Sequence, residues 1–237
     1  MARTGFAWRC LVLLLFVPAA AALCENDDAL PDAPAAHSGP RGGALVVSGA
    51  AAVNRGQAVP PLDSREKMTY WLREEAAPTS VLTTFLSAGL EQWGDMDPKY
   101  GTDAGAFGER LGSAALRAAS MRFFSDSLLP TLTDEDPRYF RMAHGRKGLR
   151  GLYAAERVFV TRRDDGSEGF NYSAVAGHAM ASALTVAYYP AVSANGRVAA
   201  KTFGLSLLGL AGGHLFREFW PDVRVRVFER RKMSGDE

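Results

Sequence analysis

Hydrophobic and polar positions follow the period of a helix over most of the chain beyond residue 62. The first such segment begins with Asp63 and Glu66, which have the spacing of a capping box, and it stops at Pro78. A second segment, TSVLTTFLSAGLEQWG, ends at Gly94, and the DMDPKYGTDAG sequence after it has the composition of a loop. A third, longer helix is predicted from about residue 103 to residue 127.

The third predicted helix carries a stripe of small residues. Gly105, Gly108, Gly112, Ala115 and Ala119 recur at spacings of three and four, so they lie on one helical face. Glycine lowers helix stability, and such a stripe therefore indicates that another backbone approaches closely, either within the chain or in an oligomer. The alternative is a glycine- and alanine-rich composition that fills helical positions at random.

The last third of the chain predicts two apolar helices. Residues 173–192 and 202–216 contain no Asp, Glu, Lys or Arg, and the short SANGR sequence joins them, so we expect an antiparallel hairpin. The second helix contains Gly209 and Gly213, another pair of small residues four apart. Helices that are apolar on every side are either buried in a core or inserted in a membrane, and both readings remain open.

One short stretch favours β-structure. Asp165 and Gly166 form a turn signal between VFVTRR and SEGFNY, which allows a short β-hairpin near Asp165. Asn171 follows and is expected to cap the next helix. The expected fold class is therefore all-α: a single glycine/alanine-rich helical bundle over residues 63–233, with an apolar C-terminal helix hairpin.

The N-terminus resembles an export signal. Arg3 and Arg9 precede the uncharged sequence CLVLLLFVPAAAAL, and Ala20 and Ala22 provide small residues for a signal peptidase. We predict a signal peptide over residues 1–22, a disordered tail or linker over residues 23–62, and export to the periplasm or cell envelope. The alternatives are an uncleaved anchor and lipid attachment at Cys24, where the preceding Leu23 is larger than a lipoprotein signal prefers.

Charge and cysteine content exclude several functions. The predicted signal peptide contains two of the 27 Lys and Arg residues and none of the 26 Asp and Glu residues, so the remainder has a net charge of about −1. Nucleic-acid binding is therefore not expected. Cys24 alone remains, which excludes an internal disulfide and a cysteine zinc site. No P-loop, nucleophile elbow or zinc-binding helix motif is present, and we expect no cofactor and no metal.

A charged stretch, TDEDPRYFRMAHG, begins at Thr133 and concentrates several chemically capable side chains. We interpret it as a structural connector between helices, in which the acids are solvated and ionised, the arginines meet them, and Tyr139 and Phe140 enter the core. The alternative is a ligand-binding or catalytic site. The candidate residues for that alternative are Asp134, Asp136, Arg138, Tyr139, Arg141 and His144.

Two histidines in the apolar helices form a second group of candidates. His178 shares a helical stripe with Ser182 and Tyr189, and His214 lies in the other helix. Facing polar groups in such a pair could bind a ligand, a metal ion or a proton. We favour the interpretation that they satisfy each other's hydrogen bonds across the helix interface.

The strings DEDPRYFR, RVFVTRRDDGSEGFNYS, AYYP and FREFWPDV together resemble a family of uncharacterised exported proteins from Acidobacteria, over roughly Met68 to Val227. The resemblance implies a bacterial envelope setting. It implies no activity and no catalytic residue.

Two functional hypotheses remain. The first is a non-enzymatic exported envelope protein that acts through helix packing with a lipid or a protein partner. The second is a small-ligand-binding protein or an enzyme, with a site near Asp134–His144 or His178–Tyr189. Several of these polar groups lining one pocket would favour the second hypothesis, and their dispersal over the surface would favour the first.

Overall fold

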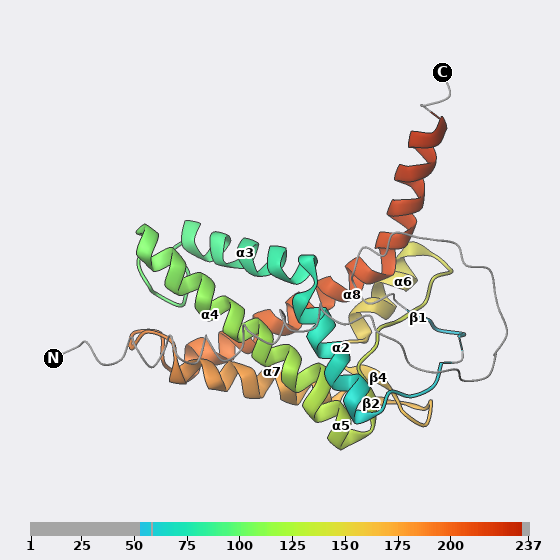
Figure 1. Ribbon diagram of the computed structural model, residues 1–237, viewed down its shortest axis with the longest axis horizontal. Helices are drawn as coiled ribbons and strands as arrows, with labels where there is room; N and C mark the ends of the chain where they lie inside the picture. Colours follow the sequence, from blue (N-terminus) through green and yellow to red (C-terminus); the bar gives the residue numbers. More distant parts are fainter. Residues whose placement is uncertain (1–52, 58, 234–237) are drawn as a thin grey trace, which may run out of the picture.

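The computed structural model describes residues 53–57 and 59–233 of the 237-residue chain, with side chains described up to residue 226. Helices dominate this part of the protein, and a few short strands accompany them (Figure 1). The prediction of a helix-dominated fold is confirmed, although the strands make all-α too strict a description. The predicted signal peptide and residues 23–52 of the predicted tail lie outside the described residues.

The first three helices begin where the sequence predicts. The capping box starts α2 (Ser64–Ala76): Glu66 N donates to the Asp63 carboxylate at 2.7 Å, and Asp63 N donates to the Glu66 carboxylate at 2.9 Å. Helix α3 (Pro78–Trp93) has a proline in its first turn, and Asp103 caps α4 (Ala104–Phe123).

The loop between α3 and α4 is held by a fully buried arginine. Arg110 Nη1 donates to the carbonyls of Met96 and Pro98 at 2.9 and 2.7 Å, and Arg110 Nε donates to the side chain of Gln92 at 2.9 Å. The guanidinium thus replaces the regular backbone partners that a loop lacks.

Helix α4 continues directly into a π-helical turn, η1 (Phe124–Leu128), and then into α5 (Leu129–Thr133). Helix α7 (Tyr172–Leu184) crosses this turn at Gly177. A Cβ at Gly177 would lie 2.8 Å from Ser125 N and 3.0 Å from the carbonyl carbon of Phe124. Only glycine therefore allows the two backbones to pack at this distance.

The short strands gather at one end of the molecule. Strand β1 (Val53–Asn54) pairs in parallel with β3 (Phe140–Arg141), although the sequence assigns β1 to the tail. Strand β2 (Glu135–Asp136) pairs with β4 (Val160–Arg163), which forms an antiparallel hairpin with β5 (Glu168–Phe170). The hairpin predicted near Asp165 is therefore confirmed. Helix α6 (Lys147–Glu156) lies between β3 and β4 in the chain.

The C-terminal helices form the predicted hairpin (Figure 1). Asn171 caps α7 (Tyr172–Leu184) through a bond from Ala174 N, and a short 3-10 turn, η2 (Thr185–Ala187), follows. Helix α8 (Gly196–Met233) is longer than predicted and contains Pro221. Figure 1 shows α8 bending sharply toward its C-terminal end, as expected for a helix with an internal proline.

Two expectations about helix faces are met only in part among the described residues, and a partner of the α4 stripe in an oligomer stays a prediction. The apolar hairpin is not buried on every side, because α8 packs against α6, α7 and η2 only on part of its circumference, which leaves Leu205 and Leu208 exposed. On α4, Gly105 and Gly108 are exposed, and nothing lies within 4 Å of a Cβ at Gly108. The buried face of α4 consists instead of Ala106, Arg110, Ser113, Ala114 and Met121.

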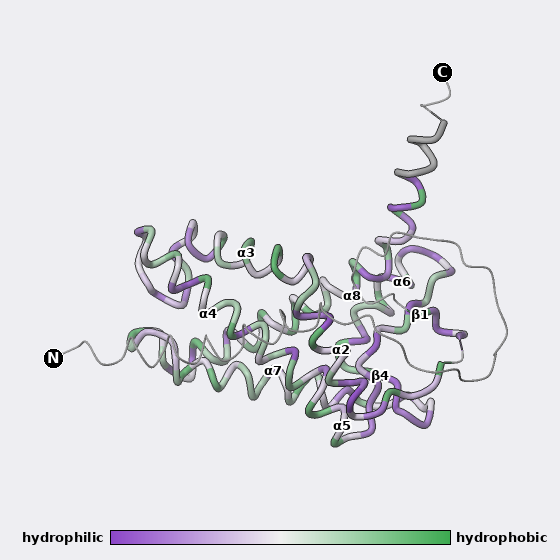
Figure 2. The backbone as a smooth tube through the Cα atoms, viewed as in Figure 1, coloured by the Kyte–Doolittle hydropathy of each residue, from purple (hydrophilic) through white to green (hydrophobic). Residues whose placement is uncertain are grey.

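Hydrophobic residues occur along α3 and α7, whereas hydrophilic residues concentrate where α2, α5 and β4 meet (Figure 2). Within residues 53–57 and 59–233, none of the helices combines the length and the apolar character that a membrane crossing requires.

Candidate functional site

A cavity of about 290 Å³ lies between the π-helical turn η1, helices α7 and α8, and the β2–β4 end of the molecule. Its apolar wall includes Ala118 and Met121 from α4 and Leu210 from α8. The polar lining comes from segments far apart in the sequence. It includes Arg122, Ser125, Asp126, Glu135, Asp136, Arg138, Tyr139, Arg157, Thr161, Arg162, Asn171, Ser173, His178, Ser206, His214 and Arg217.

The π-helical turn supplies Ser125 and Asp126 to the cavity. π-Helical turns are rare in proteins, and those that occur are often found at functional sites. The Asp126 carboxylate accepts a hydrogen bond from Ser125 Oγ at 2.7 Å. Burial raises the pKa of Asp126 to about 6, against the opposing effects of this hydrogen bond and of Arg217 and Arg122.

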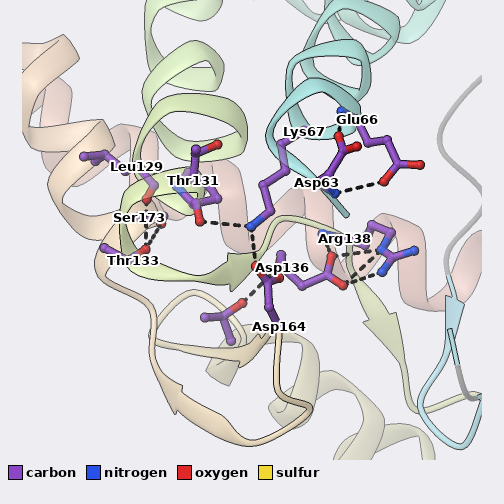
Figure 3. Close-up of polar contacts among 12 residues, drawn as sticks. Asp63, Glu66, Lys67, Leu129, Thr131, Thr133, Asp136, Arg138, Asp164 and Ser173 are labelled. Atoms are coloured by element: carbon purple, nitrogen blue, oxygen red, sulfur yellow. Dashed lines mark hydrogen bonds and ion pairs between the residues drawn. The ribbon is translucent and has the colours of Figure 1, made fainter. Parts of the chain in front are cut away.

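The corner formed by α5 and β2 builds a second wall. Glu135 is buried, and its carboxylate accepts the N–H groups of Tyr172 and Ser173 at 3.1 and 2.9 Å, at the start of α7. A carboxylate is favourable there because the first N–H groups of a helix have no partners within the helix. The hydroxyls of Thr133 and Ser173 lie 3.1 Å apart beside it (Figure 3).

The same corner also contains two ion pairs, Arg138 with Asp136 and Lys67 with Asp164 (Figure 3). Arg138 donates to both carboxylate oxygens of Asp136, with the shortest distance 2.6 Å from Nη2. The buried Lys67 Nζ donates to Asp164 at 2.6 Å and to the carbonyl of Pro130 at 3.0 Å. The prediction that these acids are solvated is therefore wrong for Glu135 and Asp136, because both side chains are buried and their carboxylates accept hydrogen bonds from the start of α7 and from Arg138.

His214 and Tyr139 stack across the cavity wall, with ring centroids 4.9 Å apart and planes inclined by 26°. Tyr139 Oη donates to Glu218 at 3.1 Å. Burial and then the positive charge of Arg217 lower the pKa of His214 to about 3, so its imidazole is neutral at pH 7. Its Nδ1 is buried and has no hydrogen-bond partner among the described residues.

His178 also lines this cavity. Its Nδ1 lies 2.8 Å from Ser206 Oγ on α8. Burial, followed by the charge of Arg122, lowers the pKa of His178 to about 4. The interpretation that this histidine is satisfied across the α7–α8 interface therefore holds for Nδ1.

The structure brings half of the ten predicted site residues together. Asp136, Arg138, Tyr139, His178 and His214 line the cavity. The others do not line it. Asp134 and His144 are exposed, Arg141 pairs with Asp222, the Oγ of buried Ser182 has no partner among the described residues, and Tyr189 accepts a bond from Arg117 at 2.9 Å.

Sequence reasoning missed several residues of the site, chiefly Asp126, Arg157, Arg162 and Arg217. The available signal for Asp126 is a single acid inside the apolar stretch FFSDSLL. The arginines gave no signal, because each is one of many in polar segments. Among the described residues, no group of three or more His, Cys, Asp and Glu side chains is placed to hold a metal ion.

Comparison with known proteins finds no matching family model, no matching curated protein and no matching solved structure. The resemblance to exported acidobacterial proteins therefore stays a prediction, and the chemistry of the site must be argued from its own residues.

Proposed function

We propose that the protein binds a small organic molecule in the cavity between η1, α7 and α8. The observation that carries the proposal is the His214 imidazole, which lines the cavity and whose buried Nδ1 has no hydrogen-bond partner among the described residues. Leaving such a group unsatisfied costs about 1–3 kcal/mol, which a ligand hydrogen bond would recover. At about 290 Å³, the volume lies at the lower end of small-molecule pockets, so the ligand is small.

The ligand that suits the histidine end of the cavity is uncharged there and partly apolar. Arg122 and Arg217 pair with Glu75 and Glu74, so neither guanidinium is left without a carboxylate. The neutral imidazoles of His178 and His214 offer hydrogen bonds, while Met121 and Leu210 offer an apolar surface. A compact ring or branched chain with one or two polar atoms meets both requirements.

A fragment screen followed by two-dimensional NMR tests this proposal. Hits should perturb the side-chain signals of His178 and His214. Gly213→Leu should abolish their binding, because Gly213 lines the cavity and has nothing within 4 Å of its Cβ position. Gly204→Leu is the matched control, since Gly204 lies on the same helix and is exposed like Gly213, but does not line the cavity. Fragments that bind both variants equally well would contradict the proposal.

A second candidate function is association with a lipid or protein partner of the cell envelope, after export by the N-terminal signal. It is supported by the exposed apolar face of α3, where Trp93 is 89% exposed. The other members of this face are Val81, Leu82, Phe85, Leu86 and Leu90. Envelope fractionation of the native protein tests it: Leu86→Ser with Trp93→Ser should release the protein from its fraction, whereas the double variant Thr83→Ala with Thr84→Ala should not.

A further inference from the structure

We propose that an outer hollow next to the cavity binds the phosphate group of a ligand. The outer hollow has a volume of about 450 Å³. Its charged lining consists of Arg55, Arg157, Arg162 and Glu168. It shares Phe140, Arg157 and Arg162 with the inner cavity, so the two spaces meet at these side chains. The inference does not depend on what the inner cavity binds.

Positive charge exceeds negative charge in the outer hollow. One carboxylate oxygen of Glu168 accepts from both Arg157 Nη2, at 2.6 Å, and Arg55 Nη2, at 3.3 Å. None of the ion pairs among the described residues involves Arg162, whose guanidinium carbon lies 4.9 Å from the centre of the Phe140 ring. The hollow therefore contains three guanidinium groups, of which two share its one carboxylate, and this excess of positive charge suits an anion.

Arg157 is built into the protein rather than held on its surface. The residue is only 6% exposed, and its guanidinium carbon lies 4.4 Å from the centre of the Tyr153 ring. Its Nε is buried and has no hydrogen-bond partner among the described residues. An arginine fixed in this way loses little entropy when an anion binds.

A phosphate group matches the geometry of these donors. A phosphate group presents several oxygens to several N–H groups at once, and guanidinium forks bind it through paired hydrogen bonds. Gly166, with φ of +87°, forms the turn beside Arg162, and a Cβ there would lie 3.4 Å from Arg162 Nη2. The turn thus leaves room for Arg162 to lie along the hollow instead of extending into solvent.

Calorimetric titration with inorganic phosphate at low ionic strength tests the proposal. Arg162→Gln should weaken binding by about tenfold or more, because a charge-assisted hydrogen bond is lost. Glu168→Gln should strengthen it by roughly threefold, because two guanidinium groups lose their shared carboxylate. The matched controls are Arg226→Gln and Glu156→Gln, which make the same changes of net charge at exposed positions outside the hollow and should leave the affinity unchanged.

Circular dichroism should show that each variant is folded, and Arg55→Gln replaces Arg162→Gln if that variant is not. Glycerol phosphate and vesicles of phosphatidic acid then distinguish a soluble ligand from a lipid headgroup. If glycerol phosphate or the vesicles bind, and Arg162→Gln weakens that binding, the result supports the proposal and identifies the source of the phosphate. Absence of phosphate binding at millimolar concentration, or equal effects of Glu168→Gln and Glu156→Gln, would overturn it.

Discussion

Arg150 Nε lies 2.7 Å from the carboxylate of Glu218, and both side chains are buried. The same carboxylate accepts the backbone N–H groups of Met142 and Ala143 at 3.0 and 3.1 Å. One acid on α8 therefore fixes both α6 and the segment that carries Tyr139 into the cavity wall. The carbonyl of Glu218, one turn before the proline of α8, also accepts a bond from Arg150 Nη2 at 2.8 Å.

Glu218→Gln should lower the free energy of unfolding by about 3 kcal/mol, because it leaves a buried guanidinium without its nearest carboxylate. The loss should stay near the lower end of the range for broken buried pairs, since Arg150 keeps Asp222 at 2.6 Å. Urea unfolding measures it. Glu156→Gln, an exposed acid-to-amide change on α6, should alter the free energy by no more than about 0.5 kcal/mol. Equal effects of the two changes would show that the Glu218 pair contributes little.

Gly177→Ala should destabilise the protein by about 1–3 kcal/mol, as overpacking does. Its Cβ would meet the backbone of Ser125 at 2.8 Å, and a backbone atom cannot move aside as a side chain can. Gly108→Ala is the matched control on α4, where nothing lies within 4 Å of the Cβ position. There alanine should be neutral or stabilising by up to about 1 kcal/mol, because it favours a helix over glycine. Thermal unfolding of the pair checks both signs.

The sequence predicts those features of the fold that depend on neighbouring residues. The capping box at Asp63 and Glu66, the end of α3 before Gly94, the cap at Asn171 and the turn at Asp165 all occur where expected. Each is a local hydrogen-bonding or conformational preference that operates over two to four residues, as caps and tight turns do.

The site could be predicted only in part, because its partners are distant in the chain. Glu218 is far from Met142 and Ala143 along the chain, and no local sequence pattern predicts that a glutamate in a helix will accept their N–H groups. The sequence did not predict the burial of Glu135 and Asp136, because adjacent charged residues usually remain in water. Here Glu135 accepts N–H groups at the start of α7, and Asp136 accepts hydrogen bonds from the Arg138 guanidinium. Periodicity identified the small residues of α4 but could not tell which face meets another helix.

Asp134 and Asp136 should respond differently to the same change from acid to amide. Asp134 is exposed and has a φ of +52°, which asparagine also adopts, so Asp134→Asn should change the free energy of unfolding by less than about 0.5 kcal/mol. Asp136 is buried and binds Arg138 through both oxygens, so Asp136→Asn should cost about 1–3 kcal/mol. Urea unfolding of the two variants under one buffer tests the difference. Similar losses would mean that the Asp136 pair behaves as an exposed one.

Stability should fall as the pH falls from about 6.5 to about 4, through the two cavity histidines. Burial lowers the pKa of His178 to about 4 and that of His214 to about 3, whereas in the unfolded chain each takes up a proton near 6.5. The unfolded state therefore binds more protons in this window, and each histidine can contribute a slope of up to about 1.4 kcal/mol per pH unit. Asp126 acts in the opposite direction below about pH 6, because burial raises its pKa to that value and the folded state keeps the extra proton.

Single substitutions can separate these two contributions. His214→Gln removes a group that resists protonation in the folded state, so its free energy of unfolding should depend less on pH between 6.5 and 4 than that of the unsubstituted protein. Asp126→Asn removes the opposing group, so its curve should be steeper than that of the unsubstituted protein below about pH 6. Urea unfolding at pH 7, 6 and 5 measures all three slopes. If the His214→Gln slope equals that of the unsubstituted protein, His214 takes up its proton near pH 6.5 in the folded cavity as it does in the unfolded chain, and the cavity does not hold the imidazole neutral below that pH.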